Sequence, residues 1–502
     1  MRQLTNPSDL DYELVKSVAW EGERCTLSDE LREKIDKNRE QFLKLIEDGV
    51  PCYGVTTGLG KLVEKDLDTE AKHALPANML RARAAAIGEP WPVEVVRAMM
   101  IIRLVNFISG RDGVRALLCE KILDLLNNNI HPWVPKLGHG MAADAIANTH
   151  AFQVLIGEGF VIDEDNTTLS ATKALRNHNI EAFDPLDKEG LALINGVTVA
   201  PALAMAVEHR LEKLLNLATA VSAVSVEGMR APKDPYDQAL IAVTKEPGTC
   251  RTIRQLNYWL EDGNTEPYKL QSPISYRIIP QVHGACHDAL QGLKQTVVWL
   301  LDSFSGNPLL TDELPPRLLS VGSFQSQHLA NQLDAVAIGL AHVGQLSEKR
   351  FHRMMNPENT GLNAQLAMRP GLDAGLVVAH KACIDICARL KLLANPVTLS
   401  VSDTSMGQED YMSLAVPAAE RLFEMAALVE ALLAYEMLGG STAVQQNKVK
   451  VSQRLKPFIH FCTKTLEPYT KDRSPGPDVE LILDALRSTQ IETQLTDAKN
   501  RL

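Results

Sequence analysis

The chain has 502 residues, of which 45% are hydrophobic and 23% are charged, and its formal net charge is −11. A chain of this size can bury a large core as a globular protein, and its negative charge argues against a nucleic-acid partner. Eight cysteines without disulfide-like spacing favour a reducing cytoplasm, and we find no apolar start typical of a signal peptide. No uninterrupted apolar run is long enough to span a bilayer, so we expect no membrane partner.

The first 200 residues alternate between predicted helices and loops. Apolar side chains fall on one face from Ser28 to Asp48, with Ser28 as N-cap and Gly49 as the stop. The segment from Pro51 to Gly60 places three glycines and two threonines around one tyrosine, which predicts a loop. Helical spacing also predicts helices over 71–88, 93–108, 117–127 and 146–157.

Long segments with helical periodicity dominate the chain from about Leu203 onward. They cover 202–225, 283–301, 328–350, 375–393 and 416–438. Pro417 fits the first turn of the last segment, and Gly439-Gly440 is its expected end. Strand patterns are few and short. The sequence predicts a mainly α protein with an N-terminal, mostly helical domain over 1–200 and a central long-helix bundle with C-terminal helices over 201–502.

Three residues could carry chemistry by their type and setting. Tyr53, in the glycine-rich loop, either packs that loop against the core or acts as a general base on a mobile, water-excluding loop. Asn195 and Gly196 end an apolar run, which also fits a buried strand or a helix end. The planar fork of Arg277 suits a carboxylate, although surface arginines are common.

A possible metal site is suggested by His283, Cys286 and His287, which spacing places on one face of a helix. None of the usual zinc spacings is met, and no fourth ligand follows from the sequence. Helical clusters of histidine and cysteine are common, so we expect no metal here.

Five segments together resemble the aromatic amino acid ammonia-lyase family, of which histidine ammonia-lyase is a typical member. They are Tyr53–Gly60, Glu189–Gly196, Gln271–Gly284, Gly322–Phe324 and Ser405–Asp410. The resemblance runs from about Tyr53 to Gln446. It implies the ammonia-lyase/fumarase-like superfamily fold, with a long central helical bundle and few short strands. It also implies a homotetramer in which each site draws residues from more than one subunit.

The resemblance also implies roles for single residues. The loop tyrosine of the family abstracts the β-proton, which makes Tyr53 the expected catalytic residue. Asn195 and Gln271 are expected at the amino-acid portion of the substrate, and Arg277 at its carboxylate. Phe324 is expected to line the pocket, although a core aromatic would fit the same pattern.

Three further residues are expected to bind the substrate ring. Glu409 matches a glutamate that meets the imidazole in histidine-specific members, so it indicates a histidine-like side chain. Lys381 stands where the family has an uncharged residue, and on an apolar stretch it can neutralise negative charge on the ring, although most helical lysines are solvated. Arg83 takes the place of a family histidine and is a weaker candidate for the same pocket.

Two departures from the family pattern concern the same chemical step. In the family an Ala-Ser-Gly triplet cyclises into an electrophilic methylidene-imidazolone, and here the degenerate triplet reads Met141-Ala142-Ala143 before Asp144. No serine can lose water, and no glycine supplies an unhindered amide. Ile274 replaces a family tyrosine that helps at the electrophile. We therefore expect no cofactor.

A substrate that needs no electrophile explains these losses. A quaternary trimethylammonium has no lone pair to add to an electrophile, and it leaves unaided as neutral trimethylamine. This favours the branch of the family that converts the betaine ergothioneine to thiourocanate and trimethylamine. The alternatives are an ammonia-lyase or aminomutase of histidine or another aromatic amino acid, and an inactive paralogue that serves as a binding or scaffold protein.

Overall fold

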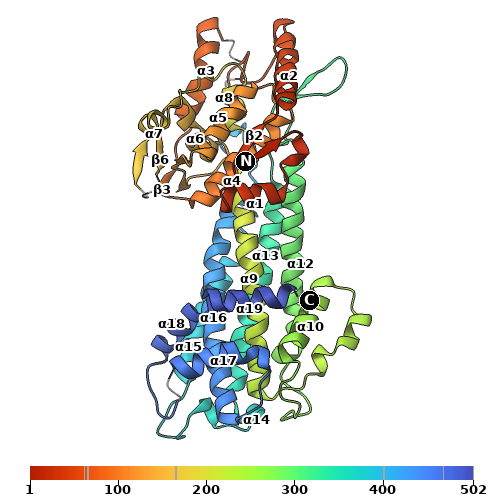
Figure 1. Cartoon of the computed structure of the whole chain (residues 1–502), viewed down its shortest axis with the longest axis vertical. Helices are drawn as coiled ribbons and strands as arrows, with labels where there is room; N and C mark the ends of the chain where they lie inside the picture. Colours follow the sequence, from red (N-terminus) through yellow and green to blue (C-terminus); the bar gives the residue numbers. More distant parts are fainter. Residues whose placement is uncertain are drawn as a thin grey trace. The chain divides into compact units, whose positions relative to one another are not determined.

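The computed structural model describes residues 1–60, 63–64, 67–163, 165, 167–399, 402–466 and 469–500 (Figure 1). The chain forms two compact units. The first contains residues 1–206, 294–331 and 397–419, and the second contains 207–293, 332–396 and 420–502. The first unit thus takes in two segments from beyond residue 200. The division into domains at residue 200 stays a prediction.

Helix α4 (Val93–Ile108) is the centre of the first unit. Thirteen of its 16 residues are buried, including Arg97, Arg103 and Asn106, so the helix is enclosed on every side. This is why its sequence is apolar almost all round rather than along one stripe. The other helices of this unit are α1 (Tyr12–Trp20), α2 (Asp29–Glu47), α3 (Thr69–Ala82), α5 (Ala116–Asn127), α6 (Ala145–Phe152), α7 (Ala171–Asn177) and α8 (Glu189–Ile194).

The strands of the first unit are two to four residues long and form small separate sheets. Strand β1 (Arg2–Leu4) pairs in parallel with β2 (Cys25–Leu27). The antiparallel pairs are β3 (Ile87–Pro90) with β5 (Pro135–Leu137), β6 (Phe160–Ile162) with both β4 (His131–Pro132) and β7 (Thr168–Ser170), and β8 (Leu309–Leu310) with β9 (Leu318–Leu319). The expectation of few, short strands is confirmed in the described part of the chain.

Four long helices contribute most of their length to the second unit. They are α9 (Val199–Met229), α12 (Ile279–Leu301), α13 (Gln327–Met354) and α16 (Ala415–Asn447). The shorter helices of that unit are α10 (Pro247–Leu260), α11 (Ile274–Arg277), α14 (Pro357–Thr360), α15 (Val377–Leu393), α17 (Lys456–Thr465), α18 (Pro475–Leu486) and α19 (Thr489–Asn500). The prediction of a mainly α protein with a long helical bundle is confirmed.

A buried ion pair shows how the long helices pack. The Arg350 guanidinium on α13 donates through Nε and Nη2 to both carboxylate oxygens of Glu436 on α16 (2.6 and 2.8 Å). Ser225 on α9 donates to the same carboxylate (2.7 Å), and both charged side chains are fully buried. Because a buried charge is costly unless it is paired and hydrogen-bonded, this network specifies how the three helices pair.

Helix α16 is longer than the sequence predicts. The prediction ended it at Gly439-Gly440, but it continues to Asn447. A Cβ at Gly439 would lie 2.5 Å from the Phe351 ring, and one at Gly440 would lie 3.2 Å from Val224. The two glycines therefore allow neighbouring helices to approach closely, and this packing outweighs their weak helix propensity of about 1 kcal/mol each.

Local signals elsewhere give mixed results. Ser28 accepts a hydrogen bond from Leu31 N and caps α2, and Gly49 follows the helix with φ +86°, both as predicted. The helix predicted over 71–88 is wrong at its end. It stops at Ala82, and the residues from Ile87 onward form β3 against Pro135–Leu137, a pairing that helical periodicity cannot reveal.

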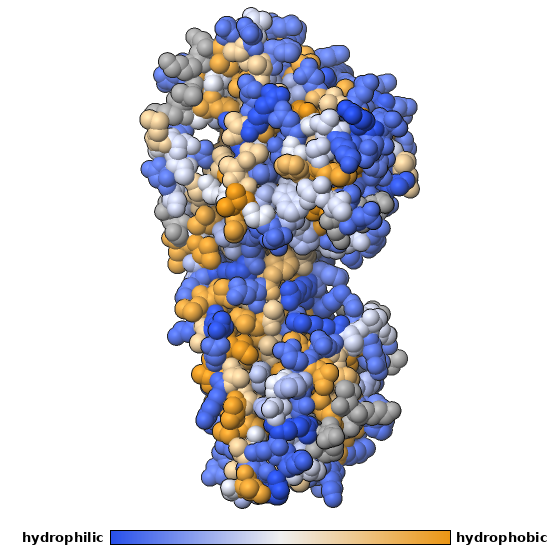
Figure 2. Space-filling model, turned by 90° about the vertical axis from the view of Figure 1, so that its left-hand side faces the viewer, coloured by the Kyte–Doolittle hydropathy of each residue, from blue (hydrophilic) through white to orange (hydrophobic). Residues whose placement is uncertain are grey.

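The expectation that no apolar segment is long enough to span a membrane is wrong for one segment of the chain. Residues Glu189–Met229 are long and apolar enough, but 89% of their most apolar window is buried inside the protein. The stretch is also broken between α8 and α9, at 195–198. Other apolar side chains stay on the surface, and Figure 2 shows them among hydrophilic ones. Those on α13 and α15 include Ile338, Val378, Ile384 and Leu392.

Candidate active site

A cavity of about 630 Å³ in the first unit brings together most of the predicted site residues. It is lined by the loop after α2, the segment before α6, the end of α8 and the segments around Phe324 and Glu409. The predicted residues on its wall are Tyr53, Arg83, Met141, Ala142, Ala143, Asn195, Phe324 and Glu409. Residues more than 350 positions apart therefore share one space.

The Tyr53 loop is held by its own threonines. Thr56 Oγ1 accepts from Cys52 N (2.9 Å) and Thr57 Oγ1 accepts from Gly54 N (3.3 Å). Gly54 has φ +68°, and a Cβ there would lie 2.7 Å from Leu59 and 2.9 Å from Leu191, so only glycine fits. The half-buried Tyr53 ring places its hydroxyl 2.8 Å from Gly60 N, which donates to it. The oxygen of the expected base is therefore held by the backbone of its own loop.

The degenerate triplet is anchored through the next residue. Asp144 Oδ2 accepts from the first amides of α9, Thr198 N and Val199 N at 2.8 Å and Ala200 N at 3.2 Å. Burial raises the pKa of Asp144, and these three amides oppose the rise. A carboxylate at a helix N-terminus is favoured by the free N–H groups and by the helix dipole. Asp144 thereby fixes the triplet against the start of α9.

Asn195 is positioned by the glycine that follows it. It ends α8 with an extended backbone, and Gly196 O accepts from Asp144 N (3.1 Å). A Cβ at Gly196 would lie 1.8 Å from Arg103 Nη1. Arg103 cannot move aside, because it is fully buried and paired with Asp112 (3.2 Å). The Asn-Gly pattern seen in the sequence therefore reflects close packing as well as a turn.

Charged groups gather on the side of the cavity that carries the triplet. Glu409 Oε2 accepts from Ala142 N (3.4 Å), and its other oxygen accepts from Ser405 Oγ (3.1 Å). Arg83, one residue beyond α3, lies near both Tyr53 and Glu409. Burial lowers the pKa of its guanidinium, whereas these two neighbours raise it. A phenol, a guanidinium and a carboxylate thus face one small space.

Three predicted substrate-binding residues do not line this cavity. Gln271, Arg277 and Lys381 belong to the second unit. Gln271 and Lys381 are exposed, and Ile274, which replaces a family tyrosine, is exposed as well. Arg277 is half-buried, and its buried Nε has no hydrogen-bond partner among the described residues. A guanidinium with an unused donor is suited to a carboxylate.

Some residues of the cavity wall were not predicted from the sequence. Asn307 lies on the wall and accepts from Val321 N (2.7 Å), which fixes the segment before Phe324. Gln408 and Met406 also line the cavity, beside Glu409. Gln408 falls within a matched segment and could have been included. Asn307 stands in a Gly-Asn-Pro segment, where no sequence pattern indicates a site.

The residues of the triplet do not fit the self-made electrophile of the family. Forming it requires a serine side chain that loses water, and Ala142 has only a methyl group. In this structure the backbone of the triplet serves another purpose, since Ala142 N donates to Glu409. The arrangement can bind a polar or cationic substrate beside a phenol that can accept a proton, and we derive no step through an electrophile.

The chain matches known proteins along most of its length. Residues 10–464 match the family model described as aromatic amino acid lyase. Histidine ammonia-lyase from Symbiobacterium thermophilum is 31% identical over 490 residues, which is 95% of each chain. Histidine ammonia-lyase from Bacillus cytotoxicus is 29% identical over 486 residues, which is 96% of each chain.

Two solved structures have the same fold. Ergothionase from Treponema denticola, in complex with desmethyl-ergothioneine sulfonic acid, superimposes with a TM-score of 0.92 at 22% identity, covering 97% of this chain and 99% of that one. Histidine ammonia-lyase from Trypanosoma cruzi gives a TM-score of 0.85 at 25% identity, covering 99% and 96%. The expected superfamily fold is thereby confirmed.

Proposed function

Because this chain belongs to the aromatic amino acid lyase family, we propose that it is a carbon–nitrogen lyase that releases trimethylamine from ergothioneine and leaves thiourocanate. The observation that carries the proposal is the cavity itself. It keeps Tyr53, Asn195 and Glu409 around a triplet that cannot form the electrophile. A catalytically inactive site should have lost some of these side chains along with the triplet serine.

The proposed reaction is a 1,2-elimination. The Tyr53 phenolate takes the proton from Cβ, the C–H electron pair becomes the second bond between Cα and Cβ, and the Cα–N bond breaks. Trimethylamine leaves with the electron pair of that bond, so it needs no activation. Glu409 and Arg83 hold the thioimidazole ring and stabilise the charge that spreads into it. Phe324 and the Tyr53 ring offer aromatic faces to the cationic head.

Binding of the substrate carboxylate is assigned to Arg277, supported by Asn195 and Gln271, and Lys381 is assigned to the ring. Three of these residues lie in the second unit and outside the wall of this cavity. The family resemblance implies a homotetramer, so we assign these three residues to other subunits that complete each cavity. The exposed apolar side chains Ile338, Val378, Ile384 and Leu392 on α13 and α15 are available for contacts with other subunits. We place the enzyme in the cytoplasm.

Similarity to ergothionase supports the same substrate. The Treponema denticola enzyme holds desmethyl-ergothioneine sulfonic acid and shares the fold over 97% of this chain. The cavity of about 630 Å³, with a carboxylate and a guanidinium on its wall, suits a substrate of this class. Ergothioneine offers a carboxylate, a polar ring and a cation to these groups.

One rival function has its own support. The relatives at 31% and 29% identity are histidine ammonia-lyases, which favours elimination of ammonia from histidine. The degenerate triplet argues against it, because a primary amine is a poor leaving group without an electrophile. The intact mass of the purified chain separates the two: cyclisation removes two waters, whereas our proposal expects the mass of the unmodified sequence.

The deciding experiment compares ergothioneine, its sulfur-free analogue hercynine and histidine as substrates. We expect trimethylamine and the conjugated thiourocanate chromophore from ergothioneine, and no ammonia from histidine. Ammonia from histidine would establish the rival lyase. Inertness toward all three, in a folded tetrameric preparation, would overturn the proposed reaction and favour the remaining alternatives, an enzyme for another aromatic amino acid or a non-catalytic paralogue.

A further inference from the structure

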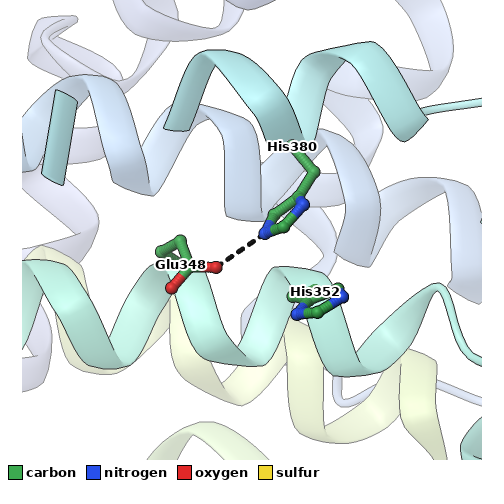
Figure 3. Close-up of side chains that lie close together, drawn as sticks. All are labelled: Glu348, His352 and His380. Carbon is green, nitrogen blue, oxygen red and sulfur yellow. Dashed lines mark hydrogen bonds and ion pairs between the residues drawn. The ribbon is translucent and has the colours of Figure 1, made fainter. Parts of the chain in front are cut away.

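Three metal-ligating side chains meet in the second unit, on two helices that do not line the cavity. Glu348 and His352 lie one turn apart on α13, and His380 lies on α15. Figure 3 shows the carboxylate and the two rings side by side. One ligand atom from each lies within 4.8 Å of the others. Across the ranges that the structure describes, no other group of three such residues is as close.

The histidines and cysteine singled out in the sequence behave differently. His283, Cys286 and His287 are all buried, and His283 Nδ1 shares a hydrogen bond with Thr219 Oγ1 (3.1 Å). Their ligand atoms do not converge to the same degree. These residues pack α12 into the core. The convergent donors come instead from two helices, with Glu348 and His352 on α13 and His380 on α15.

We propose that Glu348, His352 and His380 bind one divalent transition-metal ion of the zinc class. One carboxylate oxygen and two imidazole nitrogens are a donor set that such ions accept, and water can take the fourth position. Glu348 offers Oε1, because its other oxygen is held by Lys349 Nζ at 2.8 Å. That contact orients the carboxylate, as outer partners of metal ligands commonly do.

The site closes on an ion with small movements. Bonds of about 2.0–2.2 Å in a tetrahedral site place ligand atoms roughly 3.3 Å apart. His380 Nε2 and Glu348 Oε1 are now 2.6 Å apart and share a proton, so an ion replaces that proton and separates the pair slightly. The rings of His352 and His380 stack at 4.2 Å and 16°, and His352 must turn to aim its lone pair at the ion.

His352 is free to make that turn. It is half-buried, and within the described chain its ring is held by stacking and by no hydrogen bond. The side chain of His380 is 15% exposed, so an ion can enter from solvent. By contrast, Glu348 is buried and already aligned, so the acid is the preorganised ligand and His352 closes the site.

A metal cross-link would have a clear structural effect here. Helix α15 has 17 residues, of which only Ala379, Cys383 and Leu390 are buried. Within one chain this helix buries few side chains, so a bond between His380 and α13 should stabilise it.

The test uses the full-length protein after treatment with a chelator. Zn²⁺ is titrated in competition with a chromophoric chelator, and Co²⁺ is added separately as a probe of visible absorption. We expect one ion per chain, a visible Co²⁺ spectrum, and a higher melting temperature with Zn²⁺. His352→Ala should weaken Zn²⁺ binding at least tenfold and remove the stabilisation.

The matched control is His342→Ala, an exposed histidine on the same helix, which should bind Zn²⁺ like the unaltered chain. Glu348→Gln and His380→Ala should also bind weakly, and circular dichroism establishes that each variant is folded. No stoichiometric Zn²⁺ binding, or equal affinity in folded His352→Ala, overturns the proposal. Zn²⁺ binding is measured without enzymatic activity. Failure of the metal proposal would therefore not count against the proposed lyase reaction, and failure of the lyase reaction would not count against the metal site.

Discussion

The cavity of the first unit and the three predicted binding residues of the second unit differ in how completely one chain builds them. Around the cavity, Tyr53 is held by a backbone hydrogen bond within its own loop, and Asp144 and Glu409 are held by backbone hydrogen bonds from distant segments. In the second unit Gln271 and Lys381 are exposed, and Arg277 Nε has no partner among the described residues.

This difference indicates a division of labour. Groups that move protons or meet developing charge must be preorganised, and the first unit supplies that rigidity by itself. Groups that recognise the substrate carboxylate can be contributed by another copy of the chain, because a salt bridge needs only correct distance and orientation.

The largest effect is expected when the proposed general base, Tyr53, is replaced. Tyr53→Phe keeps the ring and removes the proton acceptor, so kcat should fall by about 10²–10⁴-fold, the usual contribution of general base catalysis. Trimethylamine release under saturating ergothioneine measures it. The matched control is Tyr268→Phe, an exposed tyrosine of the second unit, which should keep full activity. An active Tyr53→Phe protein would remove Tyr53 from its assigned role.

Loss of Asp144, which anchors the triplet, should lower the stability of the protein. Asp144→Ala leaves three amides at the start of α9 without an acceptor, and we expect the free energy of unfolding to fall by about 3 kcal/mol. Urea denaturation measures the change. Asp163→Ala is the control, since that carboxylate accepts only from an exposed turn and its loss should change little. Equal effects would show that Asp144 is no special anchor.

Replacing Arg277, the residue assigned to the substrate carboxylate, should have a smaller effect. Arg277→Ala removes a charge-assisted contact, typically about 1.5–3 kcal/mol, so kcat/KM for ergothioneine should fall roughly 10–100-fold. Arg277→Lys should recover only part, because lysine lacks the planar fork. Arg254→Ala, an exposed arginine on α10, should leave kcat/KM unchanged. A normal kcat/KM in Arg277→Ala would assign the carboxylate to another residue.

Mixing variants tests whether the two halves come from different subunits. Tyr53→Phe and Arg277→Ala each spoil a different part of the site, so dissociating and reassembling them together should produce some cavities with both residues intact. We expect activity above that of either variant alone, though well below that of the unaltered protein. Activity equal to the mean of the two variants would show that one chain supplies both residues.

The smallest effect concerns acid stability of the first unit. Burial lowers the pKa of His150 from its ordinary 6.5 to about 4, and its Nε2 accepts from Ala86 N (3.0 Å). The folded state therefore favours the neutral ring. Its contribution to stability is complete above pH 6.5 and is lost as pH falls toward 4.

His150→Gln retains an acceptor and removes the titration, so melting temperature should decline less steeply between pH 6.5 and 4 than in the unaltered chain. His178→Gln, an exposed substitution in the same unit, should keep the original slope. An unchanged slope in His150→Gln would mean that other groups govern the acid response.

The amino-acid sequence by itself determined the helical class, the long bundle, the cap at Ser28 and the identity of the Tyr53 loop, because these depend on neighbours within a turn or on a continuous motif. It also predicted the meeting of Tyr53, Asn195, Phe324 and Glu409 in one cavity, but only through resemblance to a family. Periodicity alone does not relate residues hundreds of positions apart.

Tertiary structure alone decided the rest. The Glu409 carboxylate reaches Ala142, 267 positions away, Asp144 caps a helix that begins 55 residues later, and α16 runs through two glycines because its neighbours pack against them. It also joined Glu348 and His352 to His380. These features depend on which surfaces meet when the chain is packed, and packing is a property of the whole fold rather than of any local stretch.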